Sequence, residues 1–226
     1  MAKQIFIIGG SNGGVGKSMA AMALVDHLQQ MGEHVLLVES DTSNPDLWKS
    51  HREQVETILI NLDDGDGWIE LVNVCDSHPE SAVVINTAAR NNSGVGKYGA
   101  ILESTLKELK RKLVTLWVIN RQRDSLELLK EFMDAISDGS IHVIRNGYFG
   151  DTKKFELYNS SKLRAQIEER GGKSLTLPDL ADRVSDDLYS KRMSISVAMG
   201  ELPLGNRAEL GRWRAEVGKV LAEVVQ

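Results

Sequence analysis

The stretch that decides the fold is Gly10-Ser11-Asn12-Gly13-Gly14-Val15-Gly16-Lys17-Ser18. It follows an apolar run at 5–8 and leads into a segment, 17–31, whose apolar residues recur at helical spacing before Gly32. Glycines between a strand and a helix let the backbone curl until consecutive N–H groups point at phosphate oxygens, and the helix N-terminus adds its positive dipole end. The stretch therefore predicts a phosphate-binding loop at the end of the first strand.

Two side chains close this loop. Lys17 is expected to reach the β- and γ-phosphates of a nucleotide, and Ser18 is expected to bind a magnesium ion. The strict pattern has glycine where Ser11 stands, so a glycine-rich turn without a ligand is the alternative. The residues predicted to contact the nucleotide here are Asn12, Gly13, Gly14, Val15, Gly16, Lys17, Ser18 and Met19.

Short apolar runs alternate with amphipathic segments along the rest of the chain. Strands are expected at 35–38, 57–62, 82–87, 114–120, 141–146 and 174–177, and helices at 68–75, 98–110, 126–136 and 161–169. Several runs are apolar without alternation, which is typical of strands buried on both faces. The pattern predicts an α/β fold with a doubly wound, mostly parallel sheet and helices on both faces. With no repeat or linker in the chain, we expect one domain over 1–226.

Composition excludes several classes of protein. A single cysteine, Cys75, excludes an internal disulfide, and the chain does not open with a secretory signal. No apolar run approaches the roughly 20 residues of a membrane span, so we expect a cytoplasmic protein. The net charge of −5 argues against a nucleic-acid backbone as the main partner.

The loop resembles the deviant Walker A motif of the ParA/MinD ATPases, whose pattern is Lys-Gly-Gly-x-Gly-Lys-Ser/Thr, and the likeness extends over most of the chain. The resemblance implies ATP and magnesium as cofactors and an ATP-dependent homodimer. Asn12 stands at the signature lysine, which in the family crosses the dimer to the partner's nucleotide. Its replacement puts that contact in doubt, whereas nucleotide binding itself need not suffer.

A second polar segment, Glu39-Ser40-Asp41-Thr42-Ser43-Asn44-Pro45, follows the second strand and resembles the family's first switch. Asp41 is expected to position the attacking water and to contact the magnesium shell, since a carboxylate at a strand end beside the loop is well placed for both. Lys17 and Asp41 are thus the predicted catalytic residues. The alternative for Asp41 is a turn residue in a polar loop.

The strand at 82–85 leads into Asn86-Thr87-Ala88-Ala89, where the family has Asp-Thr-Pro. The Asn86 amide oxygen can accept a hydrogen bond from a magnesium-bound water but lacks the charge that holds the ion. Hydrolysis is therefore expected to be slow, with Arg90 either a substitute cation or an ordinary solvated arginine. A second Gly-x-Gly-Lys at 94–97 follows no strand that could serve it, so we expect a flexible segment there.

The resemblance also implies a base pocket. Asn146, at the end of a strand, matches an asparagine that reads adenine in the family, and Pro178 matches a proline in the following loop. Adenine is therefore favoured over guanine. Asn120 also ends a strand and is the rival, and either asparagine could instead cap a turn.

Two C-terminal features have open interpretations. Aromatic and cationic residues interleave over 148–164, which is typical either of a nucleic-acid surface or of a loop packed over the sheet. The last helix carries an apolar stripe that includes Leu210, Trp213 and Val217, opposite a polar face of mixed charge. We expect this helix to dock on the domain rather than on a membrane.

Together these features predict an ATP-binding, slowly hydrolysing switch protein with a protein partner. Within the family the chain is similar to the small TraL/StbB/MobD-type proteins of plasmid conjugation, mobilisation or stability. One alternative is an ATP-dependent ligase resembling dethiobiotin synthetase, although Glu39-Ser40-Asp41 replaces that enzyme's substrate-binding lysine. The other alternative is a nucleotide-binding module that does not hydrolyse ATP.

Overall fold

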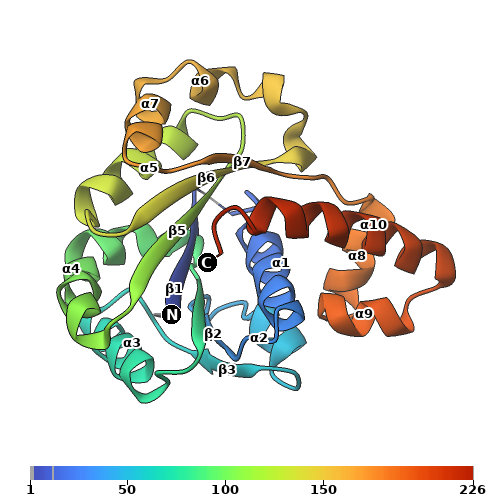
Figure 1. Cartoon of the computed structure of the whole chain (residues 1–226), viewed down its shortest axis with the longest axis horizontal. Coiled ribbons are helices and arrows are strands. Elements are labelled where there is room, and N and C mark those ends of the chain that lie inside the picture. Colours follow the sequence, from blue (N-terminus) through green and yellow to red (C-terminus); the bar gives the residue numbers. More distant parts are fainter. Residues whose placement is uncertain (1–2, 12, 226) are drawn as a thin grey trace.

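The computed structural model describes residues 3–11 and 13–225, and over these residues the chain forms one seven-stranded parallel sheet. The strand order is β3-β2-β4-β1-β5-β6-β7 (Figure 1). The strands are β1 (Gln4–Gly10), β2 (Val35–Glu39), β3 (Glu56–Leu59), β4 (Ala82–Asn86), β5 (Lys112–Ile119), β6 (Ser140–Asn146) and β7 (Ser174–Leu177). The predicted α/β fold with a parallel sheet is confirmed.

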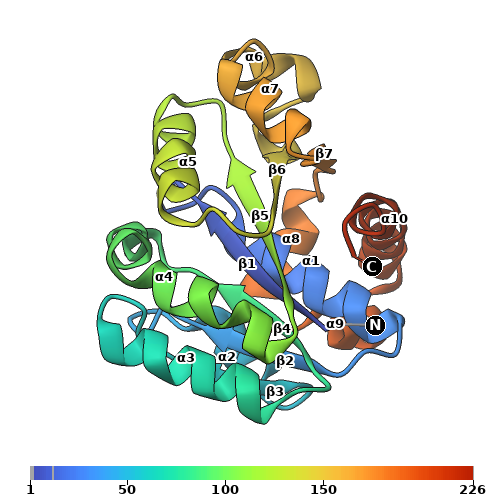
Figure 2. The same ribbon diagram turned by 60° about the vertical axis from the view of Figure 1, so that its left-hand side comes forward.

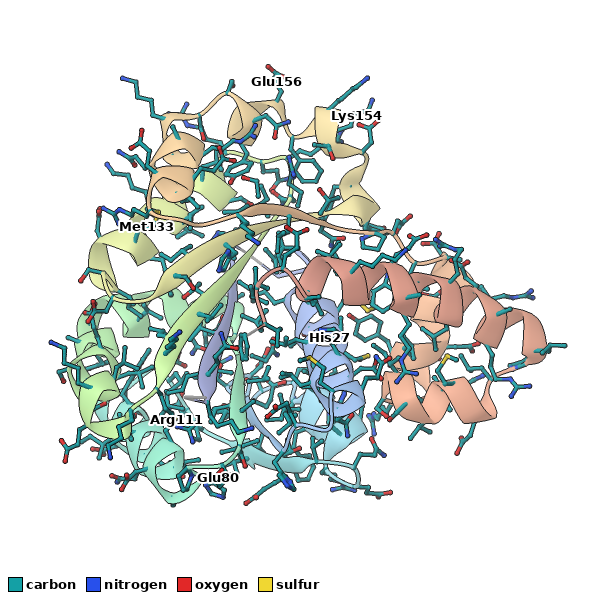
Figure 3. The ribbon with its side chains drawn as sticks, viewed as in Figure 1. His27, Glu80, Arg111, Met133, Lys154 and Glu156 are labelled. Atoms are coloured by element: carbon teal, nitrogen blue, oxygen red, sulfur yellow. The ribbon has the colours of Figure 1, made fainter. Side chains whose placement is uncertain are left out.

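Helices cover both faces of the sheet (Figure 2). They are α1 (Lys17–Gln30), α2 (Asp46–His51), α3 (Gly65–Ser77), α4 (Asn92–Leu109), α5 (Asp124–Ala135), α6 (Glu156–Asn159), α7 (Lys162–Glu169), α8 (Asp182–Ser190), α9 (Ile195–Glu201) and α10 (Leu204–Leu221). Side chains fill the space between each helical layer and the sheet (Figure 3). The sheet is therefore the middle of three layers.

Alternation along β1 explains why the sheet needs two helical layers. Phe6 and Ile8 point into the core under α1 and α8–α10, whereas Ile5 and Ile7 point into the core under α3–α5. All four side chains are at most 2% exposed. A strand with apolar groups on both faces lowers the free energy of the fold only when both faces are covered.

The sheet order determines where a ligand can bind. β1 lies between β4 and β5, and the chain passes from β1 toward β3 on one side before it returns to β5 on the other. Parallel sheets bind ligands beyond the carboxyl ends of their strands at such a reversal. The loop after β1 and the strand-end residues Glu39 and Asn86 lie at this edge.

Some predicted boundaries were wrong. β3 ends at Leu59, and Ile60 and Leu62 instead pack from the following loop into the core. The segment 94–97, expected to be flexible, lies inside helix α4. An added Cβ at Gly94 would lie 2.0 Å from the Leu62 carbonyl oxygen, so this glycine permits close helix packing. The short helix α2 and the helices α8 and α9 were not predicted at all.

The last helix docks on the domain, as predicted. Leu210, Trp213 and Val217 of α10 are at most 2% exposed in the core beside α1. Arg214 donates to both carboxylate oxygens of Asp26 on α1, each at 2.7 Å. His27 of α1 also faces α10, where an added Cβ at Gly218 would lie 3.6 Å from its ring (Figure 3).

The aromatic segment after β6 packs largely inward. Phe155 and Tyr158 are 1% and 2% exposed in the core on the α4–α7 side, whereas Tyr148 is 64% exposed. Packing, rather than a continuous nucleic-acid surface, accounts for these two aromatic residues. Across residues 3–11 and 13–225, the structure has no helix both long and apolar enough to cross a bilayer.

Candidate functional site

The glycine loop turns through two left-handed residues, Gly14 with φ +80° and Gly16 with φ +104°. An added Cβ on Gly13 or Gly14 would have no described atom within 4 Å, so the loop faces open space. No side chain among the described residues caps the N-terminus of α1, and the first N–H groups of a helix have no partner within the helix itself. Asn12 lies outside the described residues. The loop therefore has the form that an anion requires.

Lys17 is the first residue of α1 and is only 7% exposed. Its ammonium donates to the Ser11 carbonyl at 2.9 Å. Burial lowers the pKa of Lys17 to about 8, and the carboxylate of Asp41 opposes this shift in part. A buried ammonium held mainly by a neutral carbonyl oxygen would gain from an anion at the loop.

Ser11, which stands where the strict pattern has glycine, is buried and bonds to Ser125 on α5, with 2.8 Å between the two hydroxyls. Ser125 also donates to the side-chain oxygen of Asn120 at 2.8 Å. That oxygen accepts the Gln122 N–H as well, so Asn120 fixes a turn. Asn120 lines neither of the two cavities described below.

A cavity of about 390 Å³ lies over the loop, and we call it the phosphate-loop cavity. It brings together the ends of β1, β2 and β4 with the start of α2 and the end of α8. Its lining residues are Gly13, Gly14, Val15, Gly16, Lys17, Ser18, Glu39, Asp41, Asn44, Asp46, Asn86, Thr87, Ala88, Ala89 and Tyr189. The predicted residues Lys17, Ser18, Asp41 and Asn86 thus share one cavity.

Asp41 organises its own loop as well as lining the cavity. Its Oδ1 accepts the N–H groups of Ser43 at 3.2 Å and Asn44 at 3.1 Å. The same oxygen lies 3.3 Å from the guanidinium of Arg90, which also pairs with Asp63 at 2.6 Å. Arg90 therefore ties the segment after β2 to the segment after β4, and Asp41 has the turn geometry that was its alternative.

Glu39 and Asn86 end neighbouring strands and are register partners. The Asn86 amide donates to both Glu39 oxygens, at 3.2 and 3.1 Å, and the Asp41 N–H donates to one of them at 2.8 Å. Burial raises the pKa of Glu39 to about 7, although these hydrogen bonds oppose the shift. Sequence reasoning treated Glu39 only as part of a polar segment. Its position directly after the apolar run 35–38 was the available signal.

A second cavity, of about 210 Å³, adjoins the first beyond Gly14 and Gly16, and we call it the adjoining cavity. Asn146 and Pro178, the two residues expected to form a base pocket, both line it. The full lining is Gly14, Gly16, Met19, Asn146, Tyr148, Leu177, Pro178, Asp179, Leu180, Ser185, Asp186, Tyr189 and Trp213. Tyr189 lines both cavities and therefore lies between them.

Two side chains that sequence reasoning did not assign to this site shape the adjoining cavity. The Trp213 indole donates to the Pro178 carbonyl at 2.8 Å and so connects α10 to the loop after β7. Tyr189, at the end of α8, is 42% exposed. Neither residue belongs to a motif, and Trp213 showed only the apolar stripe of its helix.

Asn146 connects the two cavities. Its amide nitrogen donates to the Val15 carbonyl at 2.9 Å, and its oxygen accepts the Tyr148 N–H at 3.1 Å. Gly16 lies so close that an added Cβ would be 2.3 Å from the Asn146 amide nitrogen. After these contacts, the Asn146 amide nitrogen can still donate one hydrogen bond, and the amide oxygen can still accept one.

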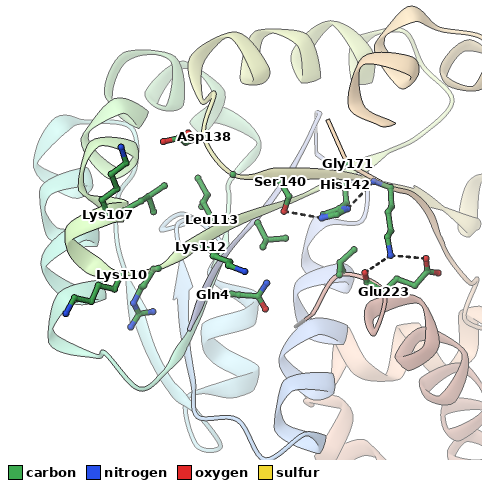
Figure 4. Close-up of a pocket in the computed structure, with 16 residues that line it drawn as sticks. Gln4, Lys107, Lys110, Lys112, Leu113, Asp138, Ser140, His142, Gly171 and Glu223 are labelled. Carbon is green, nitrogen blue, oxygen red and sulfur yellow. Dashed lines mark hydrogen bonds and ion pairs between the residues drawn. The ribbon is translucent and has the colours of Figure 1, made fainter. Parts of the chain in front are cut away.

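The cavity of about 590 Å³ in Figure 4 lies elsewhere, at the opposite edge of the sheet. Lys107, Lys110, Lys112 and Lys173 line it together with His142. Lys107 and Lys110 lie at the carboxyl end of α4, where cations offset the negative end of the helix dipole. This cavity contains no part of the glycine loop and none of the predicted site residues.

The side chains that line the phosphate-loop cavity offer oxygen atoms, which are the ligands that magnesium takes. Residues 3–11 and 13–225 contain no group of three His, Cys, Asp or Glu side chains that could hold a metal ion. Asn86 Oδ1 is buried without a hydrogen-bond partner among the described residues, in the cavity that Ser18 also lines. Magnesium bound at a phosphate loop keeps several waters, and such an oxygen accepts from one of them.

Comparison with known families identifies the class. Residues 5–149 match the model of the CobQ/CobB/MinD/ParA nucleotide binding domain, so the chain belongs to this family of nucleotide-binding proteins. It is 72% identical to Protein MobD of Acidithiobacillus ferrooxidans over 225 residues, which cover 100% of this chain and 99% of that protein. The resemblance to ParA/MinD proteins that the loop indicated is confirmed.

Solved structures confirm the fold. The MinD cell division protein of Aquifex aeolicus has a TM-score of 0.56 at 13% identity, with 95% of this chain and 97% of that chain covered. The cell division protein FtsY of Thermotoga maritima has a TM-score of 0.56 at 17% identity, with 79% of this chain and 62% of that chain covered. The chain therefore has the fold of the P-loop nucleotide-binding proteins.

Proposed function

We propose that this protein is an ATP-binding switch that hydrolyses ATP slowly and acts in plasmid mobilisation. The observation that carries the proposal is the phosphate-loop cavity, in which an uncapped helix N-terminus, the buried Lys17 and the Ser18 hydroxyl converge. We propose that one domain spanning 1–226 carries this activity.

Lys17 would contact the terminal phosphates, and Ser18 would hold magnesium with the help of Asp41. Binding an anion would compensate the buried Lys17 ammonium, whose pKa of about 8 reflects its desolvation. Magnesium, when bound, would neutralise charge on the phosphates. Asp41 would orient the attacking water with its Oδ2, since its Oδ1 accepts the turn N–H groups.

Adenine would occupy the adjoining cavity. Asn146 retains one donor and one acceptor position there, which match the paired acceptor and donor on an adenine edge. Pro178 also lines this cavity, and Tyr189, which lines both cavities, would lie near the ribose. The resemblance of Asn146 and Pro178 to family positions supports ATP over GTP.

Slow turnover follows from the missing charges. Asn86 is neutral where the family has aspartate, and Asn12 stands at the signature lysine. A transition-state cation alone is worth roughly 10³–10⁵ in rate, so hydrolysis without one should be slow. The partly exposed Arg90 is held by two carboxylates and is not free to replace it without rearrangement.

The proposed role in a plasmid system rests on sequence similarity to plasmid proteins. The 72% identity to MobD and the resemblance to plasmid proteins support a role in mobilisation, with conjugation and partition as related possibilities. We propose an ATP-dependent homodimer that signals to a protein partner of the plasmid system in the cytoplasm, with nucleic acid as a further ligand class to test.

The test is calorimetric titration with ATP, ADP and GTP, with and without magnesium. Wild type should bind ATP, and Lys17→Ala should bind it about 100-fold more weakly, which corresponds to about 2.7 kcal/mol. Lys97→Ala is the matched control, because Lys97 ends the other Gly-x-Gly-Lys but lies in helix α4. Equal ATP affinity for wild type and Lys17→Ala would exclude the assignment.

A non-hydrolysing module is the second candidate, and Asn86 favours it. Phosphate release and molecular mass measured in the same samples separate the two functions. ATP-dependent dimers with slow phosphate release support the switch, whereas tight ATP binding to a monomer without release supports the module.

A further inference from the structure

The carboxylate of Glu39 and the amide of Asn86 form a buried pair at the floor of the phosphate-loop cavity. The two side chains are 1% and 3% exposed and come from register partners on β2 and β4. The Asn86 nitrogen lies 3.2 and 3.1 Å from the two Glu39 oxygens. Because the sheet fixes both strand ends, neither side chain can leave the other without breaking buried hydrogen bonds.

This contact determines the orientation of the amide. An ionised carboxylate only accepts hydrogen bonds, so Asn86 must turn its NH₂ group toward Glu39. The Asp41 N–H holds one Glu39 oxygen at 2.8 Å and so limits rotation of the carboxylate. Asn86 Oδ1 is consequently turned away from Glu39, and it is buried with no partner among the described residues.

A buried carbonyl oxygen without a donor is unfavourable, and native structures rarely keep one without a role. The cavity that Asn86 lines also contains Lys17 and Ser18, the residues proposed to hold the terminal phosphates and magnesium. A magnesium-bound water is a hydrogen-bond donor, and the proposed magnesium would bring such a donor into this cavity.

We infer that Glu39 is a positioning residue for magnesium, and that Glu39 and Asn86 together replace the single aspartate that related proteins have after this strand. Glu39 supplies the negative charge from β2, and Asn86 supplies the acceptor oxygen from β4. The inference rests on the proposed function, since it assigns a role at the same nucleotide site.

The pairing predicts that the charge can be exchanged between the two positions. Glu39→Gln leaves no carboxylate in the pair. Asn86→Asp, which restores the residue typical of the family, places two buried carboxylates in contact and should be unfavourable. The double variant again has one carboxylate and one amide, but the amide now lies on β2 and the carboxylate on β4.

The experiment compares wild type with E39Q, N86D and the double variant at pH 8. Mn²⁺ affinity is measured by electron paramagnetic resonance with saturating ADP, and melting temperature is measured without ligand. E39Q should bind Mn²⁺ at least 10-fold more weakly, and N86D should melt at a lower temperature than wild type. The double variant should recover Mn²⁺ affinity to within about threefold and should recover the melting temperature of wild type.

Each result is decisive. Two results would overturn the inference, provided that ADP binding is intact. One is an E39Q variant that binds Mn²⁺ as tightly as wild type. The other is a double variant whose loss of Mn²⁺ affinity equals the sum of the losses in the two single variants. If the wild-type chain binds no ADP, the proposed function fails instead, and the ligand-free melting temperatures still test the pairing. In that case, an N86D variant with the same melting temperature as wild type would overturn the inference.

Discussion

The phosphate-loop cavity and the adjoining cavity are built in different ways. The phosphate-loop cavity takes most of its lining from continuous segments that directly follow β1, β2 and β4. The adjoining cavity draws on β6, the loop after β7, α8 and α10, which are far apart in the chain. The first is therefore determined mainly by local backbone geometry, whereas the second depends on how distant helices dock.

The largest effect is expected from undocking α10. Arg214→Met removes the ion-pair partner of Asp26, whose side chain is 5% exposed. Among the described residues, Asp26 then keeps the Gln30 amide as its one side-chain donor. An unpaired buried carboxylate costs about 3–5 kcal/mol, and we expect the free energy of unfolding to fall by about 3 kcal/mol. Urea denaturation measures it.

Arg212→Met is the matched control for this variant. Arg212 lies on the same helix, but its pairs with Glu209 and Glu216 are exposed and should contribute less than about 1 kcal/mol. Equal losses in the two variants would show that the Asp26 pair does not dock the helix.

Acid should lower the free energy of unfolding through His51, which lies in the helix α2 beside the phosphate-loop cavity. Burial lowers the pKa of His51 in α2 to about 4 from an ordinary 6.5. The unfolded chain therefore binds this proton more readily, so stability is full above pH 6.5 and is lost as pH falls toward 4. The whole shift corresponds to about 3 kcal/mol.

Urea unfolding at several pH values measures this loss. The dependence between pH 6.5 and 4 should shrink in His51→Gln and persist in His34→Gln, since His34 lies exposed before β2. An unchanged pH dependence in His51→Gln would assign the acid sensitivity to other groups.

Gly16 tests the boundary between the cavities. Gly16→Ala places a Cβ at φ +104° and 2.3 Å from the Asn146 amide, so the free energy of unfolding should fall by about 2 kcal/mol. ATP affinity should fall with it, because the loop and Asn146 must both shift. Gly13→Ala meets no described atom within 4 Å and should unfold like wild type. Similar losses in both variants would contradict this.

The smallest effect is expected from a change at the adjoining cavity alone. Trp213→Phe removes the hydrogen bond to the Pro178 carbonyl and should cost about 1 kcal/mol. The preference for ATP over GTP should decrease, whereas affinity for inorganic pyrophosphate should stay at the wild-type value. A parallel loss of pyrophosphate affinity would show that the two cavities are not separable.

Sequence reasoning reached the sheet and the phosphate loop because both follow from neighbouring residues. Apolar runs without alternation indicated buried parallel strands, and Gly14, Gly16 and Lys17 predicted the turn into α1. It failed at 94–97, where a glycine pattern typical of loops serves helix packing against the Leu62 carbonyl. Asn146 and Pro178 were found through resemblance, since their own surroundings in the sequence are ordinary.

The sequence by itself determined the parallel α/β fold, the family and the glycine loop between β1 and α1, because strand burial and glycine turns are encoded within a few residues. Only the tertiary structure decided that Glu39 orients the Asn86 amide, that Tyr189 lies between the two cavities, and that Trp213 supports the wall of the second. Glu39 and Asn86 are 47 positions apart, Trp213 and Pro178 are 35 apart, and Tyr189 is 175 positions from Gly14, with which it lines the adjoining cavity. Docking of whole elements, rather than any local pattern, brings them together.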